Sequence, residues 1–195
     1  LSVTIPHKTS VIKYLDKLDR TTSEIGAVNT VYRQGSKLIG ANTDWQGAAQ
    51  AINIPQYLKF RAKMYPVTRS SPVRVPERGS ETSYCDVIPQ GTKRGNDQAV
   101  ILGGGGVARA IAWALLQHQI PVTIVTRNPR QGMNAARDLG RPSPVQSSGF
   151  GAADGCRYAP WDKLYDIKDI SLLINATPIG MFPAVVSSPV PPGIF

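Results

Sequence analysis

The sequence has few cysteines, no long apolar run and no internal repeat. Its two cysteines, Cys85 and Cys156, lie far apart and lack the spacing of metal ligands, so we predict no metal site and ordinary thiols in a reducing compartment. No apolar run approaches the roughly 20 residues that a membrane-spanning helix requires, so we expect no membrane partner. With 195 residues, the chain has room for one large or two small domains.

Acidic residues are scarce as well: 13 Asp and Glu stand against 22 Lys and Arg, for a net charge of +9. Such a charge raises the hypothesis of a nucleic-acid partner. The distribution argues against it, because residues 53–97 carry +4 of the +9 (eight basic minus four acidic residues) and no basic helix face is visible elsewhere. An anionic cofactor and a carboxylate substrate would use a basic cleft equally well, so we expect small-molecule ligands and no nucleic acid.

The most informative stretch is residues 98–130. The apolar runs at 99–102 and 122–125 predict two strands, and an alanine-rich pattern at 107–118 predicts a helix between them. Four glycines at 103–106 separate the first strand from the helix. This order is typical of half of a dinucleotide-binding unit, and it predicts an α/β fold with a parallel sheet.

The glycine turn fits the G-x-G-x-x-G/A spacing through Gly103, Gly105 and Ala108. The first allows a sharp turn, the second lets the backbone approach a pyrophosphate, and the third lets helix and strand pack closely. The helix N-terminus would supply N–H groups and partial positive charge to that phosphate. A tight turn needs glycine in any case, but the position between a strand and a helix favours cofactor binding.

The end of the second strand lacks the acid that NAD sites usually place there. No acidic residue occurs between Asp97 and Asp138, and Thr126, Arg127 and Arg130 stand near the strand end instead. Arg127 can stack on adenine and pair with a 2′-phosphate, which favours NADP over NAD. The alternative, that Arg127 and Arg130 are solvated surface charges, stays open and applies more to Arg130.

The first third of the chain reads as alternating strands and helices. We predict strands at 1–6, 28–32 and 37–41, and helices at 7–18 and 45–52.

Short polar and charged residues follow these strands. Lys8 lies in a predicted first helical turn just past a strand, where α/β proteins place ligand-contacting residues, and the helix dipole disfavours a lysine there. Asp44 can be the N-cap of the next helix and Asn29 a turn former, and spacing alone favours these structural roles. Lys8 and Asp44 would meet only if the two strand ends are adjacent.

The remaining segments predict a linker and a third core strand. Residues 54–97 are rich in proline, serine and arginine and indicate an interdomain linker with an inserted loop. We predict a short helix at 133–139, a loop at 140–160 and a strand at 171–174.

Thr177 and Met181 follow the carboxyl end of the last predicted strand, where a nicotinamide would lie in such a fold. A capped loop and a core methionine are the alternative interpretations of these two residues.

Several blocks of the sequence, taken together, closely resemble the shikimate dehydrogenase family, including its quinate-using relatives. They are SVTIPHK (2–8), IGAVNTV (25–31), GANTDW (40–45), GGGGVARA (103–110) and INATPIGM (174–181). They occur in the family's order and extend over nearly the whole chain. The glycine block alone is not specific to the family.

The resemblance implies an N-terminal α/β substrate-binding domain followed by a Rossmann-like NADP-binding domain with a parallel sheet. We assign residues 1–53 to the first domain, 54–97 to a linker or insertion and 98–195 to the second domain. The family's N-terminal serine pair and a C-terminal substrate-contacting glutamine have no counterpart, so both domains are expected to be truncated. The insertion is longer than the family's usual connection.

Site residues are also implied by the resemblance. Lys8 and Asp44 match the catalytic pair, and Thr4 and Asn29 match residues that bind the substrate's hydroxyls. The implied cofactor-binding residues are Gly103, Gly105, Gly106, Val107, Thr126, Arg127, Asn128, Thr177 and Met181. Thr126 departs from the asparagine common in NADP-using members, whereas Arg127 is retained.

The implied activity is that of an NADP-dependent oxidoreductase, the reversible reduction of 3-dehydroshikimate to shikimate by NADPH in chorismate and aromatic amino acid biosynthesis. Lys8 would donate the proton and Asp44 would hold the lysine head group. The enzyme would be cytoplasmic, as a homodimer or as part of a multifunctional polypeptide. Two alternatives stay open: a quinate/shikimate dehydrogenase that uses NAD, and a non-catalytic regulatory relative.

Overall fold

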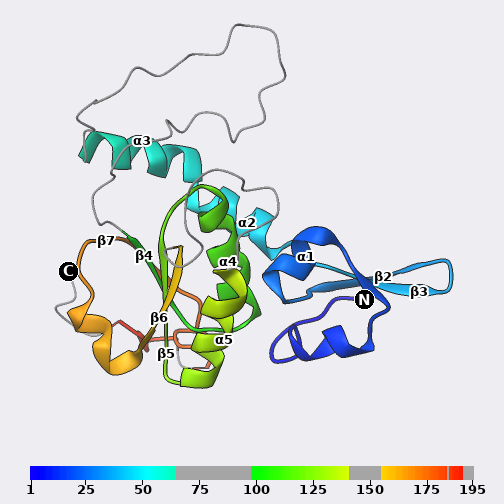
Figure 1. Cartoon of the computed structure of the whole chain (residues 1–195). Coiled ribbons are helices and arrows are strands. Elements are labelled where there is room, and N and C mark those ends of the chain that lie inside the picture. The colour runs from blue at the N-terminus through cyan, green and yellow to red at the C-terminus, as the bar shows by residue number, and fades with distance from the viewer. Residues whose placement is uncertain (65–97, 141–154, 184, 191–195) are drawn as a thin grey trace, which may run out of the picture.

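The computed structural model of the chain describes residues 1–64, 98–140, 155–183 and 185–190, which form two separate sheets with helices packed between them (Figure 1). None of the helices in these ranges has the length and apolar character of a membrane-spanning segment. The elements in chain order are η1 (Ser10–Tyr14), β1 (Lys17–Leu18), α1 (Arg20–Ile25), β2 (Thr30–Gln34), β3 (Lys37–Ala41), α2 (Asp44–Ile52), α3 (Ile54–Met64), β4 (Gln98–Leu102), α4 (Gly106–Gln117), β5 (Val122–Thr126), α5 (Pro129–Leu139), β6 (Cys156–Pro160), η2 (Trp161–Asp166) and β7 (Ile170–Asn175).

The first sheet has three strands in the order β1-β3-β2. β2 and β3 form an antiparallel ribbon close to the predicted strands, and β1 pairs with β3 in parallel. The predicted strand at 1–6 is reduced to a single bridge between Ser2 and Thr30, flanked by a hydrogen bond from the Val3 amide to the Asn29 carbonyl. The N-terminal segment therefore still lies beside β2.

The predicted helix at 7–18 is wrong. That segment forms the short 3₁₀ helix η1 and then the two-residue strand β1. Its apolar residues, including Val11 and Leu15, do pack together against buried Val28 and Val31. The apolar pattern thus identified the side chains that pack on this core, which are partly buried, but not the backbone conformation, since β-branched residues in this segment favour α-helix only weakly.

The second sheet has four parallel strands in the order β6-β5-β4-β7. β4, β5 and β7 match the predicted strands, and α4 and α5 pack on one face of the sheet while η2 packs on the other. Successive residues of β4 point to the two sides: Ile101 joins the cluster under the helices and Leu102 the cluster under η2. Because both faces are covered, strands β4 and β5 are almost fully buried. This is the predicted Rossmann-like α/β fold.

Strand β6 lies within the predicted loop at 140–160, so that prediction is wrong for residues Cys156–Pro160, while residues 141–154 lie outside the described ranges. β6 is an edge strand that ends in a proline and has no β-branched residue, which explains the weak signal. The Cys156 thiol is buried, and burial raises its pKa to about 12, so it is protonated at neutral pH.

Helical structure covers more of the chain than the sequence indicated, in α5 and in α3. α5 begins at Pro129, with the Asn128 side chain accepting a hydrogen bond from the Gln131 amide, an N-cap followed by proline that marks a helix start. The predicted linker at 54–97 is wrong at its start, where α3 is helical and buries Ile54 in the main core. Residues 65–97, with Cys85, lie outside the described ranges.

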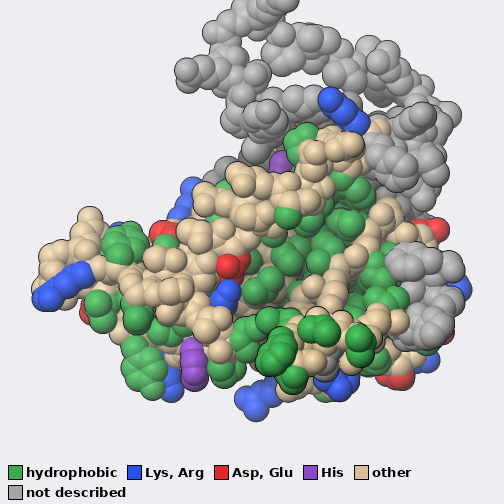
Figure 2. Space-filling model, turned by 180° about the vertical axis from the view of Figure 1, so that it is seen from behind, with side chains coloured by type: hydrophobic (Ala, Val, Ile, Leu, Met, Phe, Trp, Pro, Cys, Tyr) green, Lys and Arg blue, Asp and Glu red, His purple; other side chains and the backbone are tan. Residues whose placement is uncertain are grey.

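The two sheets meet through α1, α2 and α4. Trp45 of α2 and Trp113 of α4 make an edge-to-face contact with ring centroids 5.1 Å apart, and the Trp113 indole donates a 3.0 Å hydrogen bond to Glu24 of α1. Seen from behind, hydrophobic side chains gather beside the four-stranded sheet, whereas basic side chains mark the tip of the β2–β3 ribbon (Figure 2). The two sheets are thus joined through α1 and α2, which both pack on α4.

Candidate active site

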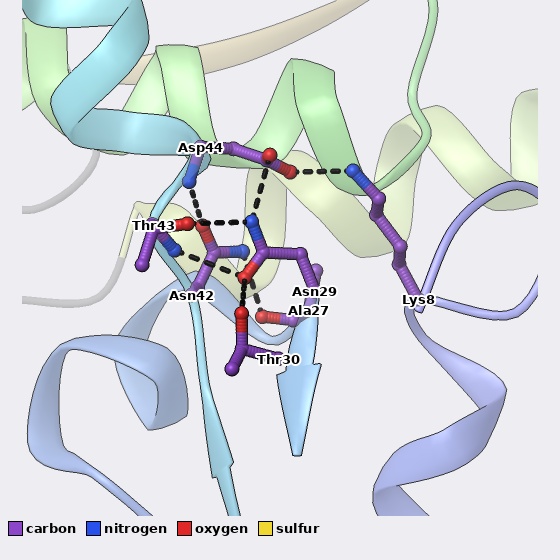
Figure 3. Close-up of polar contacts among 7 residues, drawn as sticks. All are labelled: Lys8, Ala27, Asn29, Thr30, Asn42, Thr43 and Asp44. Carbon is purple, nitrogen blue, oxygen red and sulfur yellow. Dashed lines mark hydrogen bonds and ion pairs between the residues drawn. The ribbon is translucent and has the colours of Figure 1, made fainter. Parts of the chain in front are cut away.

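Lys8 lies in the turn between the N-terminal segment and η1. Its backbone carbonyl accepts a 2.7 Å hydrogen bond from the Val28 amide, which ties the turn to the loop before β2. Its ammonium group lies 2.6 Å from the Asp44 carboxylate, and the two side chains are 12% and 23% exposed (Figure 3). The two residues, 36 positions apart, therefore form one partly buried ion pair.

Asp44 is the first residue of α2 and is separated from the end of β3 by Asn42 and Thr43. Its second carboxylate oxygen accepts a 2.9 Å hydrogen bond from the Asn29 amide group. The N-cap of α2 is Thr43, whose side chain makes no capping hydrogen bond. The alternative role of Asp44 as an N-cap is therefore wrong, and its carboxylate is directed at Lys8 and Asn29.

Asn29 is more than a turn former, because its side chain joins three others. Its carbonyl oxygen accepts hydrogen bonds from the Thr43 amide and the Thr30 hydroxyl, and its amide donates to Thr43 and Asp44 (Figure 3). The orientation of Asn29 and of the Asp44 carboxylate is therefore fixed by hydrogen bonds on both sides.

Asn42 is a residue that sequence reasoning missed as part of the site. It is 5% exposed, donates to the Ala27 carbonyl at 2.8 Å and accepts from the Asp44 amide at 2.9 Å. It holds the start of α2 against the loop before β2. A signal was present, since Asn42 opens the run of three short polar residues at the end of β3.

Thr4 is not brought into this network. Its side chain is exposed, its carbonyl accepts from the His7 amide at 2.9 Å, and among the described residues its hydroxyl makes no hydrogen bond. Its predicted role in binding a substrate hydroxyl stays a prediction.

The glycine turn connects β4 to α4. Gly103 has φ +108°, a conformation that favours glycine, and a Cβ there would lie 2.9 Å from the Ala176 carbonyl oxygen. Gly105 is the N-cap of α4, and a Cβ built on it meets no atom within 4 Å. Val107 is half-buried and packs on the main core. The turn therefore presents open space at a helix N-terminus, which fits a pyrophosphate.

The glycine turn also touches Lys8. A Cβ built at Gly106 would lie 2.8 Å from the Lys8 Cβ. The structure thus brings the predicted catalytic pair and the predicted phosphate turn together, although they come from different sheets.

Of the three predicted cofactor-binding residues at the end of β5, two make local hydrogen bonds and one is exposed to solvent. Thr126 is buried and its hydroxyl accepts a hydrogen bond from the Asn128 amide, while the Asn128 side chain caps α5. Arg127 is exposed, as a residue that pairs with a ligand phosphate would be. The structure thus gives Thr126 and Asn128 local roles that do not require a cofactor.

The loop after β7 lies beside the glycine turn. The Ala176 amide donates to the Leu102 carbonyl at 2.9 Å, and the Thr177 methyl lies 3.3 Å from a Cβ built at Gly103. The Thr177 hydroxyl donates to Asn175 at 2.6 Å, and Met181 is 57% exposed, so Met181 is not a core methionine. The capped-loop interpretation of Thr177 is therefore correct locally, and the loop still borders the predicted cofactor site.

Chemically, the arrangement offers an ammonium group held by a carboxylate beside an open helix N-terminus. Such a pair can move a proton at a substrate oxygen. No group of three or more potential metal ligands occurs in the part of the chain that the structure describes.

Comparisons with known proteins point in one direction. The family model described as the shikimate dehydrogenase substrate binding domain matches residues 1–31. The chain is 33% identical to the shikimate dehydrogenase (NADP(+)) of Methanopyrus kandleri over 94% of its length and 27% identical to that of Exiguobacterium sibiricum over 97%. The chain spans about half the length of these relatives, 50% and 51%.

Solved structures give the same result. A shikimate dehydrogenase in complex with NADP⁺ aligns with 96% of this chain and 50% of its own, at a TM-score of 0.58 and 28% identity. The Thermus thermophilus enzyme in complex with NADP(H) and shikimate aligns with all of this chain and 53% of its own, at a TM-score of 0.56 and 26% identity. The resemblance to the shikimate dehydrogenase family is thus confirmed along nearly the whole chain, as is the Rossmann-like α/β fold.

Proposed function

We propose that the protein containing this chain is an NADP-dependent shikimate dehydrogenase. The observation that carries the proposal is the Lys8–Asp44 ion pair, held by Asn29 and lying against the glycine turn of α4. The chain is 27% to 33% identical to relatives that are named shikimate dehydrogenase (NADP(+)). Residues 1–53 would form the substrate-binding domain and residues 98–195 the NADP-binding domain.

The residues present fit the cofactor. The open space before Gly105 would accommodate a pyrophosphate, and the exposed Arg127 would meet a 2′-phosphate. Thr177, beside Gly103, would border the nicotinamide together with Met181. When bound, NADPH would supply the hydride that reduces the substrate's carbonyl carbon.

Lys8 would supply the proton. Its ammonium group would donate a proton to the carbonyl oxygen of 3-dehydroshikimate as the carbon accepts hydride, which leaves a neutral amine and the hydroxyl of shikimate. In the reverse direction the amine would take the proton from that hydroxyl. Asp44 would hold the Lys8 head group in place, and Asn29 would fix Asp44 while presenting its own amide to substrate hydroxyls.

The test is a rate measurement on the complete protein, following the absorbance of the reduced cofactor. Shikimate and quinate are each paired with NADP and NAD, for the wild type, Lys8→Ala and the exposed control Lys13→Ala. We expect turnover with shikimate and NADP, a loss in kcat of about 10²–10⁴-fold in Lys8→Ala with little change in KM, and no loss in Lys13→Ala.

Other outcomes would change the assignment. Turnover with quinate and NAD would keep the chemistry but refute the specificity argument based on Arg127. A folded protein that binds shikimate without turnover in any combination would make it a regulatory relative.

The proposal extends to location and assembly. By its resemblance to this family the protein would act in the cytoplasm. It would be a homodimer or part of a larger polypeptide, as in the chorismate mutase/shikimate 5-dehydrogenase fusion protein of Clostridium acetobutylicum, which aligns with 98% of this chain at a TM-score of 0.60 and 26% identity. Size-exclusion chromatography with light scattering on the complete protein distinguishes these two arrangements.

A further inference from the structure

The fourth glycine of the turn, Gly106, is not required by the backbone conformation. It is the first residue of α4, and any ordinary residue readily adopts the helical backbone conformation. What a side chain there would meet is Lys8: an added Cβ would lie 2.8 Å from its Cβ, 3.1 Å from its Cδ and 3.3 Å from the Cβ of Ala27. A carbon–carbon distance below 3.0 Å is not tolerated, so either Lys8 or α4 would have to move.

Lys8 has little freedom to move away. Its carbonyl accepts a 2.7 Å hydrogen bond from the Val28 amide, and its ammonium group donates a 2.6 Å hydrogen bond to the Asp44 carboxylate. The closest contact with Gly106 is made by the Cβ, whose place is set by the backbone rather than by a flexible side-chain end. The stem of Lys8 is therefore held between its own turn and the first turn of α4.

We propose that Gly106 is a positioning residue: because it lacks a side chain, the aliphatic stem of Lys8 can pack directly against α4. This contact fixes the distance between the lysine ammonium group and the glycine turn, although Lys8 lies beside the first sheet and the glycine turn follows a strand of the second. Gly106 would thus set the reach of Lys8 toward a ligand bound at the turn, rather than make room for the phosphate. This inference rests on the proposed function for its kinetic consequences, but the contact itself does not.

Gly105 provides a matched comparison one residue away. It has φ −77°, which any residue adopts, and a Cβ built there meets nothing within 4 Å. A methyl group at Gly105 would fill the open space before the helix and leave Lys8 untouched. The two glycine-to-alanine variants therefore separate occupation of the phosphate space from displacement of Lys8.

The experiment compares Gly106→Ala and Gly105→Ala in the complete protein, with shikimate and NADP. For Gly106→Ala we expect kcat to fall about 10- to 100-fold, because a displacement of about 1 Å costs up to about 100-fold in rate, with KM for NADP within about threefold of wild type. For Gly105→Ala we expect the opposite split, with KM for NADP raised about tenfold and kcat within about threefold.

Three results would overturn the inference. One is an unchanged kcat in Gly106→Ala, and another is a raised KM for NADP at unchanged kcat, which would make Gly106 a phosphate contact. The third is a Gly106→Ala protein that is unfolded by circular dichroism while Gly105→Ala folds, because Gly106 would then serve the fold and not the position of Lys8.

A second measurement is independent of turnover. Acetylation of Lys8 by a water-soluble active ester, followed by peptide mass spectrometry, is compared with acetylation of the exposed Lys13 in the same protein. We expect Lys8 to react more slowly than Lys13 in the wild type and severalfold faster in Gly106→Ala than in Gly105→Ala. Equal acetylation rates of Lys8 in the two variants would refute the positioning role of Gly106. If the wild type shows the expected labelling but no turnover, only the proposed function is refuted.

Discussion

The two sheets of the chain are stabilised in different ways. In the four-stranded sheet, β4 and β5 are buried between helices on one face and η2 on the other. Beside the three-stranded sheet, the core cluster among the described residues has Val3, Val28 and Val31 as its buried members, and side-chain hydrogen bonds around Asn29 and Asn42 hold the loops. The predicted catalytic residues Lys8 and Asp44 therefore lie in the region with the smaller apolar core.

The smaller region depends on the larger one for its position. Arg109 of α4 is buried, donates to the Ile25 carbonyl at 3.3 Å and pairs with Asp138 at 2.9 Å. Ile25 and Ala27 are buried next to Ala110 of α4, with Trp113 packed against them. The loop carrying Ala27 and Asn29 is therefore located by its contact with α4 as well as by the small core cluster around Val28.

The largest difference is expected in core truncations. Ile124→Ala, in the fully buried β5, should lower the free energy of unfolding by about 2–5 kcal/mol through lost burial and a cavity. Val31→Ala should lower it by only about 1–2 kcal/mol, since it removes two methyl groups from a smaller cluster. Urea unfolding measures both, with the exposed Leu38→Ala as a near-neutral control. A larger loss for Val31→Ala would contradict the comparison.

The contact between the regions gives the next largest effect. Arg109→Ala should lower the free energy of unfolding by about 1–3 kcal/mol, because the Ile25 carbonyl and the Asp138 carboxylate lose a charged donor. Arg137 pairs with the same Asp138 at 3.3 Å from an exposed position, so Arg137→Ala should cost about 0–1 kcal/mol. Similar losses in the two variants would show that Arg109 does not dock the regions.

A smaller effect is expected from the buried amide in the site. Asn42→Ala should cost about 1–2 kcal/mol, because the Ala27 carbonyl loses its buried donor. It should also lower kcat of the proposed reaction, since the Asp44 amide loses its acceptor and the start of α2 is less fixed. Gln50→Ala, on the exposed side of α2, removes an amide that lies outside the site and should change neither quantity.

The smallest effect is a pH dependence within the larger region. Burial lowers the pKa of His118, at the end of α4, below its ordinary value of 6.5. The unfolded chain therefore binds the proton more tightly, so the stability contributed by neutral His118 is present above pH 6.5 and is lost as the pH falls through the lowered pKa. The free energy of unfolding, measured from pH 7 to about pH 5, should fall less steeply in His118→Gln. Identical slopes would mean that His118 is not desolvated.

The strand–turn–helix–strand order around the glycines was predicted correctly because its signals are local. Apolar runs of strand length, a glycine turn and an alanine-rich helix follow each other within residues 98–126. The ribbon of β2 and β3 and helix α2 were predicted for the same reason. The specific blocks around Lys8, Asn29 and Asp44 also sufficed to identify the family resemblance.

Elements with mixed signals were not predicted. The segment 7–18 has helical spacing of apolar residues, but it forms a 3₁₀ helix and a short strand that leave those residues partly buried. The edge strand β6 has no β-branched residue, and α3 begins in a segment whose prolines indicated a linker. In each case tertiary contacts outweighed a weak local preference.

The sequence by itself determined which residue types stand at the ends of the strands: a lysine, an aspartate, amides and a run of glycines. Only the tertiary structure decided that Lys8 and Asp44 form an ion pair across 36 positions and that the stem of Lys8 rests on Gly106. The physical reason is range: turn and helix preferences act over a few residues, whereas these contacts depend on how α1 and α2, beside the first sheet, pack on α4 of the second.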